Sequence, residues 1–149
     1  MHKKFLIVIF AIIIILIWFS FFNQPNKEAD NQKEVVAESV DKIIIAHFHG
    51  TNQCFSCIKV GEYALKTIED EFKEEYQKGL IVFMDINGDL EENQEIVEKY
   101  RARGSSLFIN TISNGIDHIK ENTTVWRLVN NENSFKKYFT EALNTILDK

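Results

Sequence analysis

Residues 43–57, IIIAHFHGTNQCFSC, decide the fold of this chain. The stretch begins as an apolar, strand-like run and continues through a polar turn into a helix that carries Cys54 in its first turn. Cys54 and Cys57 are the only cysteines among 149 residues. The unpaired amides and the dipole of a helix N-terminus favour a thiolate at Cys54, and Cys57 follows one turn later as a resolving partner. The motif therefore indicates redox chemistry or soft-metal chemistry.

The N-terminus predicts a membrane anchor. Phe5 to Phe22 is an uncharged run of eighteen residues, long enough as a helix to cross the hydrocarbon core. Its bulky end does not fit a signal-peptide cleavage site, so we expect an uncleaved signal anchor. Lys3 and Lys4 would hold residues 1–4 in the cytoplasm. The chain is therefore expected to pass the cell membrane once, with its domain on the extracytoplasmic side.

Composition divides the rest of the chain into a tether and a domain. Residues 23–42 are polar and charged and include Pro25, the only proline, which predicts a flexible linker. Residues 43–149 have the length of one domain with one core. Without Lys3 and Lys4, 15 basic residues face 22 acidic ones, a formal charge of −7. This balance argues against nucleic acid as a partner.

Apolar periodicity alternates between strand and helix along the domain. Strands are predicted at 43–49, 80–84, 107–112 and 116–120, and helices at 54–78, 90–102 and 132–147. The fold class is thus α/β with the order βαβαββα. This order, with a Cys-x-x-Cys motif at the first strand–helix junction, resembles the thioredoxin fold.

A narrower resemblance lies in the sequence around the motif. The matching words are Phe48–Cys57, Asp85-Ile86-Asn87, Glu92-Asn93, Tyr100, Ser106-Leu107 and Val125-Trp126. They resemble the nitrophenyl compound nitroreductase subunit ArsF family, a thioredoxin-like family. The resemblance implies an association with reduction of nitroaromatic compounds, including nitrophenyl arsenicals, alongside a nitroreductase partner subunit and an efflux permease. It transfers Cys54, Cys57 and His49 as candidate catalytic positions.

The chain departs from ordinary thioredoxins at a key position. The residue before the third strand, a cis-proline in those proteins, is here Ser105 or Ser106. A cis peptide at a non-proline bond costs about 2.5–4 kcal/mol, so a trans bond is expected. The buried acid often found beneath the motif has no clear equivalent either.

Two histidines lie close to the cysteines in the sequence. Strand alternation places His47 and His49 on one face, so an imidazole can stand where the acid would be. A protonated histidine would favour the Cys54 thiolate, and a neutral one could take the proton from Cys57. In the alternative interpretation, His47 is a hydrogen-bonded core residue and His49 a turn residue without a catalytic part.

Several other functions fit the same residues. The two imidazoles and two thiols could form a zinc site, and the reduced dithiol alone could bind trivalent arsenic or a soft metal for a transporter. A single structural disulfide and a fold that serves only as an interface are further alternatives. The chain has no glycine-rich dinucleotide or phosphate loop. We therefore expect no cofactor other than the redox-active Cys54–Cys57 disulfide, and a protein redox partner as the source of electrons.

Overall fold

The computed structural model describes residues 40–148, which contain one mixed β-sheet. Its strands are β1 (Val40–His49), β2 (Ile81–Asn87), β3 (Ser106–Ser113) and β4 (Ile116–Glu121). Their order is β2-β1-β3-β4, with β2 parallel to β1 and with β3 antiparallel to both β1 and β4. The predicted anchor and residues 23–39 of the predicted linker lie outside the described residues.

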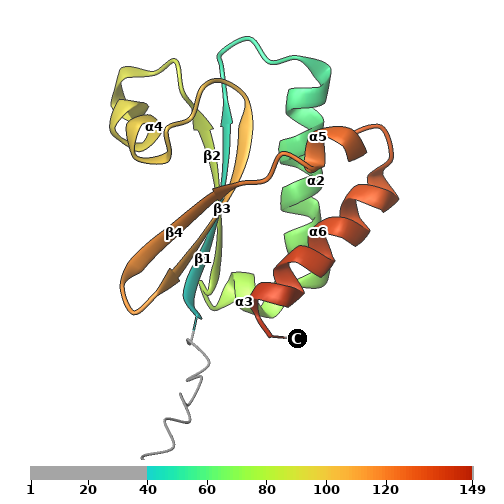
Figure 1. Ribbon diagram of the computed structural model, residues 1–149. Coiled ribbons are helices and arrows are strands. Elements are labelled where there is room, and N and C mark those ends of the chain that lie inside the picture. The colour runs from blue at the N-terminus through green and yellow to red at the C-terminus, as the bar shows by residue number, and fades with distance from the viewer. Residues whose placement is uncertain (1–39, 149) are drawn as a thin grey trace, which may run out of the picture. The chain divides into compact units, whose positions relative to one another are not determined.

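The helices cover both faces of this sheet. They are α2 (Phe55–Glu71), α3 (Lys73–Gln77), α4 (Gln94–Tyr100), α5 (Val125–Leu128) and α6 (Glu132–Ile146), and a 3₁₀ turn, η1 (Glu91–Asn93), precedes α4. Figure 1 shows α2 and α6 on one side of the sheet and α4 on the other. Among residues 40–148, no helix combines the length and hydrophobicity that a membrane span requires.

The alternation of side chains along β1 divides the core in two. Ile43 and Ile45 pack in the cluster that contains residues of α2 and α6, whereas Ala46 and Phe48 pack with Tyr100 of α4. Because successive strand residues point to opposite faces, His47 and His49 lie on the face that α2 covers. The predicted placement of both histidines on one face is confirmed.

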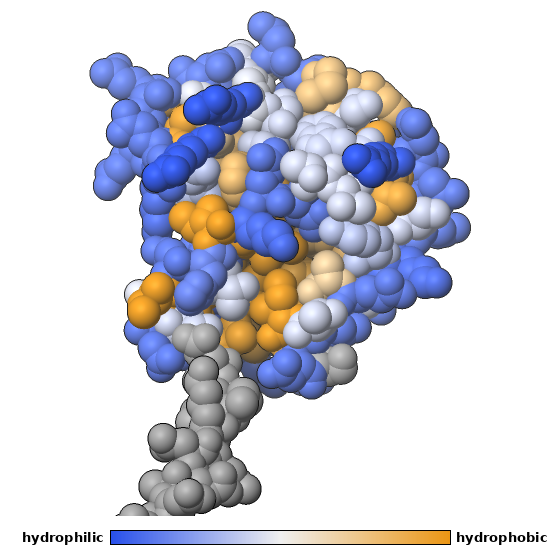
Figure 2. Space-filling model, in the orientation of Figure 1, coloured by the Kyte–Doolittle hydropathy of each residue, from blue (hydrophilic) through white to orange (hydrophobic). Residues whose placement is uncertain are grey.

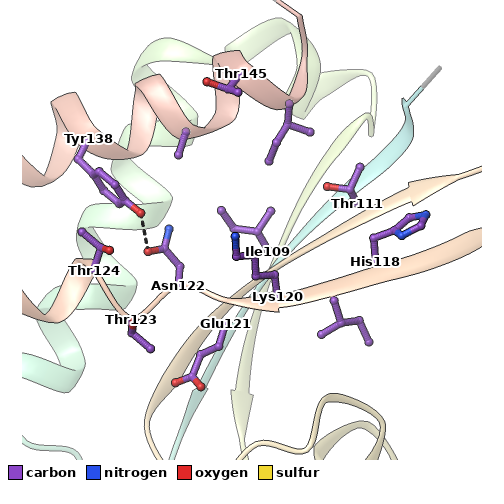
Figure 3. A pocket seen from close by; sticks show the side chains of 13 residues that line it. Ile109, Thr111, His118, Lys120, Glu121, Asn122, Thr123, Thr124, Tyr138 and Thr145 are labelled. Carbon is purple, nitrogen blue, oxygen red and sulfur yellow. Dashed lines mark hydrogen bonds between the residues drawn. The ribbon is translucent and has the colours of Figure 1, made fainter. Parts of the chain in front are cut away.

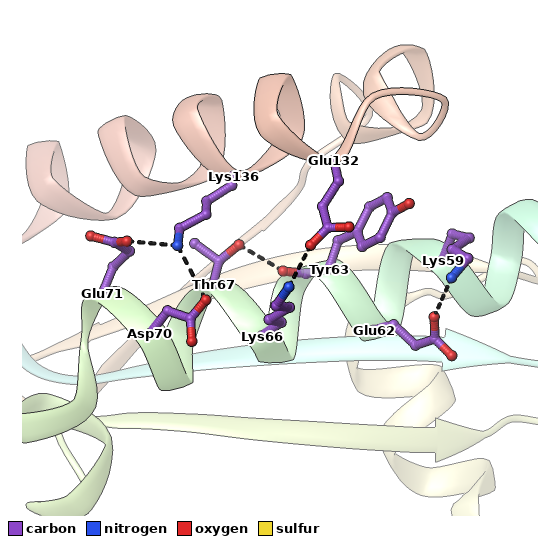
Figure 4. A network of polar contacts seen from close by, with 9 residues as sticks. All are labelled: Lys59, Glu62, Tyr63, Lys66, Thr67, Asp70, Glu71, Glu132 and Lys136. Carbon is purple, nitrogen blue, oxygen red and sulfur yellow. Dashed lines mark hydrogen bonds and ion pairs between the residues drawn. The ribbon is translucent and has the colours of Figure 1, made fainter.

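A row of ion pairs joins α2 to α6 above the larger core cluster. Lys66 Nζ lies 2.7 Å from Glu132 Oε1, and Lys136 Nζ lies 3.1 Å from Asp70 Oδ2 and 2.8 Å from Glu71 Oε1 (Figure 4). Exposed pairs of this kind contribute little to stability, because solvent screens the charges. The apolar side chains beneath them, each worth about 1.5–3 kcal/mol when buried, therefore dominate the packing of α6.

The predicted α/β class and element order are confirmed, and the differences are local. The first predicted helix is divided at Phe72, whose φ of −127° and ψ of 33° leave helical geometry while its side chain is buried. The helix predicted at 90–102 is shorter, because a 3₁₀ turn occupies its start and Arg101 ends α4 in the left-handed region. The short helix α5 was not predicted.

Candidate redox site

The two cysteines form a disulfide at the start of α2. Cys54 is the N-cap residue and Cys57 lies in the first turn, with their Cα atoms 5.1 Å apart. The Cys57 amide donates a hydrogen bond to Cys54 Sγ over 3.2 Å. Cys54 is exposed, whereas Cys57 is 9% exposed. The amide and the helix dipole would stabilise negative charge on Cys54 after reduction, and Cys54 is the more accessible of the two residues.

Hydrophobic side chains flank the exposed cysteine. Phe55 is 72% exposed and Ile58 is 41% exposed, both in the first turn of α2. Figure 2 shows a hydrophobic area at the upper right, over the start of this helix. Beside it, Lys59 lies 5.7 Å from the centroid of the Phe55 ring, and its hydrogen bond to Glu62 raises the pKa of its ammonium group. The exposed sulfur thus stands in a partly apolar surface.

His47 is buried beneath α2 and is paired with a carboxylate. Its Nδ1 atom lies 2.7 Å from Oδ1 of Asp85, the residue that faces it in the register of β1 and β2. Its Nε2 atom is buried and has no hydrogen-bond partner among residues 40–148. The ring lies directly against Gly61, where an added Cβ would be 2.6 Å from Nδ1. His47 therefore occupies the inner side of the helix that carries the cysteines.

His49, the predicted catalytic histidine, lies at the end of β1. Its Nδ1 atom is 2.9 Å from the carbonyl oxygen of Gly50, and its Nε2 atom is 3.5 Å from Asp85 Oδ1. The His47 and His49 rings are 5.6 Å apart between centroids. One carboxylate is therefore close to both imidazoles, directly bonded only to His47.

A hydrogen-bonded clasp holds the loop between β1 and Cys54. The Thr51 amide donates to Asp89 Oδ2 over 2.7 Å, and Asn87 Nδ2 donates to Thr51 Oγ1 over 3.2 Å. A Cβ atom at Gly50 would lie 3.1 Å from the same Asp89 carboxylate oxygen, so a glycine lets this side chain approach closely. The clasp connects the loop before the disulfide to the loop after β2.

Serines stand where ordinary thioredoxins carry the cis-proline, with Ser105 directly before β3. Ser106 begins β3, is buried, and faces Phe48 of β1. Its hydroxyl group donates to the carbonyl of Gly104 over 3.1 Å. The described residues contain no cis peptide bond, which confirms the expected trans geometry at this position.

The described residues present no ready-made metal centre in the disulfide state. No group of three or more histidine, cysteine, aspartate or glutamate side chains in residues 40–148 is arranged to hold a metal ion. The two cysteines are joined to each other, and the two histidines turn their Nδ1 atoms to Asp85 and Gly50.

A second concave surface lies away from the cysteines. This groove, of about 770 Å³, runs between the β3–β4 hairpin and α6, and its lining includes Thr111, Asn122 and Thr145. Tyr138 donates a hydrogen bond to Asn122 across one end of it (Figure 3). Neither cysteine contributes to its lining.

Two acidic residues of this site were missed from the sequence. Asp85 pairs with His47, and Asp89 holds the Thr51 amide. The signal for Asp85 was a charged residue directly after the apolar strand predicted at 80–84. Its partner becomes visible only when the parallel register of β1 and β2 is known.

Comparisons with known proteins address the fold. No protein-family model matches the chain, and no curated protein is similar to it. A solved thioredoxin from Thermus thermophilus is similar over 68% of this chain and 74% of its own, with 14% identity and a TM-score of 0.43. Human ERp44 in its zinc-bound form is similar over 76% of this chain, with 21% identity and a TM-score of 0.47. This chain spans 29% of the ERp44 chain.

The fold is thioredoxin-like. Its four-stranded mixed sheet, the helices on both faces and a Cys-x-x-Cys disulfide at the end of β1 define it. Because a fold of this kind serves many functions, the function has to be argued from the cysteines and their surroundings.

Proposed function

We propose that this chain is a thiol–disulfide oxidoreductase that uses Cys54 as the attacking cysteine and Cys57 as the resolving cysteine. One observation supports this assignment above the others: the two sulfurs are bonded, yet only Cys54 is exposed. An incoming disulfide or thiol therefore reaches Cys54 more readily than Cys57. The second sulfur remains buried until it resolves the mixed disulfide.

The reaction follows from this asymmetry. In the reduced state the Cys54 thiolate attacks a partner disulfide, forms a mixed disulfide and releases one partner thiolate. The Cys57 thiolate then attacks Cys54 Sγ and releases the second partner thiolate. Two electrons pass to the partner, and the Cys54–Cys57 disulfide seen in the structure is restored. A donor thiol pair reduces it again by the same exchange.

His49 is retained in this proposal as a residue that assists Cys54. It stands at the end of β1, where the loop toward Cys54 begins, and its Nε2 atom faces the Asp85 carboxylate at 3.5 Å. A positive charge on this ring would favour the thiolate of a nearby cysteine.

The cellular setting belongs to the same proposal. The apolar residues 5–22 would anchor the protein in the cell membrane, and Lys3 and Lys4 would keep its N-terminus in the cytoplasm. The resemblance to the nitrophenyl compound nitroreductase subunit ArsF family supports a link to nitroaromatic reduction. Full reduction of a nitro group takes six electrons and one dithiol supplies two, so we propose that this chain serves a partner subunit as an accessory redox protein.

Reduction of a generic protein disulfide by the full chain, supplied with a thiol donor, tests the proposed activity. We expect turnover by the wild type and its loss in Cys54→Ser and Cys57→Ser. Activity that survives in both variants would refute the assignment. Stoichiometric binding of a trivalent arsenical by the reduced chain, without any disulfide reduction, would instead identify a dithiol binding module.

A further inference from the structure

The site contains a buried base, His47, that has no part in the exchange of sulfurs itself. His47 is 2% exposed, and its neighbours are Asp85 from β2, His49 from β1, and Gly61 from α2. On the β3 side its register partner is the apolar Leu107. Asp85 and His49 are thus the titratable side chains that contact it.

The hydrogen bond to Asp85 fixes the tautomer of this histidine. An ionised carboxylate can only accept, so the proton of the neutral imidazole lies on Nδ1, which donates to Asp85 Oδ1 over 2.7 Å. The lone pair of Nε2 is then left without a donor in the disulfide state. This lone pair is therefore available to accept a proton.

Helix geometry places this base one turn of α2 away from the resolving cysteine. Gly61, which contacts the imidazole ring, lies four residues after Cys57, so both are on the same face of α2. Cys57 is also the less exposed of the two cysteines. Its thiol must lose a proton before it can attack Cys54, yet bulk water has little access to it.

We propose that His47 accepts the proton of the Cys57 thiol and that Asp85 positions and stabilises the resulting imidazolium. This inference rests on the proposed thiol–disulfide exchange and assigns the proton transfer within it. The proton moves from Cys57 Sγ to His47 Nε2, directly or through one water molecule. The Cys57 thiolate then forms the bond to Cys54 Sγ, and the partner sulfur leaves with the electron pair of the broken bond.

The proton can return to solvent through the same two residues, His47 and Asp85. The Asp85 side chain is 56% exposed although its partner is buried, so it extends from the imidazole to the surface. A proton taken up at Nε2 can be balanced by release from Nδ1 through this carboxylate. The His47–Asp85 pair thereby connects a buried thiol to water without opening the helix.

A two-phase exchange experiment separates this step from the rest of the reaction. The reduced full chain is mixed with an equimolar chromogenic disulfide probe, dithiobis-nitrobenzoate. The first coloured thiolate is released when Cys54 attacks, and the second when Cys57 resolves the adduct. For His47→Gln we expect an unchanged first phase and a second phase about 100-fold slower near neutral pH. His118→Gln, which changes an exposed histidine on β4, serves as the matched control.

The pH dependence of the second phase distinguishes proton transfer from a structural effect. In His47→Gln the second phase should accelerate with pH across the range in which an ordinary thiol ionises, whereas the wild type should already be fast near neutrality. Asp85→Asn should slow the same phase about 10-fold. If His47→Gln does not fold, the rate of this phase in Asp85→Asn tests the proton transfer instead. Second phases equal to the wild type in rate and pH profile would overturn the inference. A wild type that releases no second thiolate would instead refute the proposed exchange itself.

Discussion

The Nδ1 atom of His47 lies 2.7 Å from Oδ1 of Asp85, and the two residues face each other across the parallel strands β1 and β2. The imidazole is 2% exposed and the carboxylate 56% exposed. An exposed charge thus orients a buried ring beneath the helix that carries both cysteines. The buried polar pair belongs to the sheet, whereas the two cysteines belong to the start of α2.

Replacement of Gly61 by alanine should disturb this arrangement. The added Cβ would lie 2.6 Å from Nδ1 and 2.7 Å from Cε1 of His47, so the buried ring has to move. Overpacking of a full core costs about 1–3 kcal/mol, while alanine in a helix recovers at most about 1 kcal/mol. We expect the free energy of unfolding to fall by about 1 kcal/mol or more in urea titrations. Gly88→Ala, whose Cβ meets nothing closer than 3.4 Å, is the control, and equal stability of both variants would contradict the close packing of His47.

Removal of the His49 side chain tests its proposed influence on Cys54. In His49→Ala, alkylation of the reduced Cys54 thiol should require a higher pH than in the wild type if the imidazole assists Cys54 as proposed. The measurement is the rate of reaction with iodoacetamide as a function of pH. An unchanged profile would leave His49 as a turn residue bonded to Gly50.

Removal of the Asp89 carboxylate should loosen the loop before Cys54. Asp89→Ala deletes the acceptor of the Thr51 amide, which is 2.7 Å from Oδ2. Because this site is exposed, we expect the free energy of unfolding to fall by about 1 kcal/mol. We also expect the Thr51 amide to exchange its hydrogen faster with solvent. Glu92→Ala removes an equal charge from the neighbouring 3₁₀ turn and should leave this exchange rate unchanged. Persistent protection of the Thr51 amide in Asp89→Ala would argue against the clasp.

Asp117 should make the hairpin sensitive to acid. Its hydrogen bond from Asn110 and its ion pair with Lys99 lower the pKa of this carboxyl group below its usual value near 3.8. A carboxyl group whose pKa is lower in the folded state than in the unfolded state stabilises the fold at pH values above its unfolded-state pKa. This stabilisation is lost as the pH falls through the folded-state pKa. The wild type should therefore lose more stability below pH 3.8 than Asp117→Asn does, as measured by urea midpoints. Parallel stability curves for the two proteins would contradict this coupling.

Most of the fold follows from the sequence because its patterns are local. The apolar runs of the strands and the three-and-four spacing of the long helices predicted the element order, and the cysteines marked the first strand–helix junction. The break at Phe72 and the short helix α5 depend on core packing, which no local pattern encodes. For the same reason the helix before Arg101 was predicted too long.

The site was predictable only in part. Strand alternation placed His47 and His49 on one face, and the structure confirms this. The pairing of His47 with Asp85 joins residues 38 positions apart, so it requires the sheet register. The contact between Gly61 and His47 requires the depth at which α2 packs on the sheet.

Trapping of the mixed disulfide tests the central claim, that Cys54 attacks and Cys57 resolves. Each reduced chain is mixed with dithiobis-nitrobenzoate, and the products are identified by mass spectrometry. The wild type should release two thiolates and regain the Cys54–Cys57 disulfide, whereas Cys57→Ser should release one and retain the adduct on Cys54. A stable adduct on Cys57 in the wild type, or one that forms as fast in Cys54→Ser as in Cys57→Ser, would contradict the account.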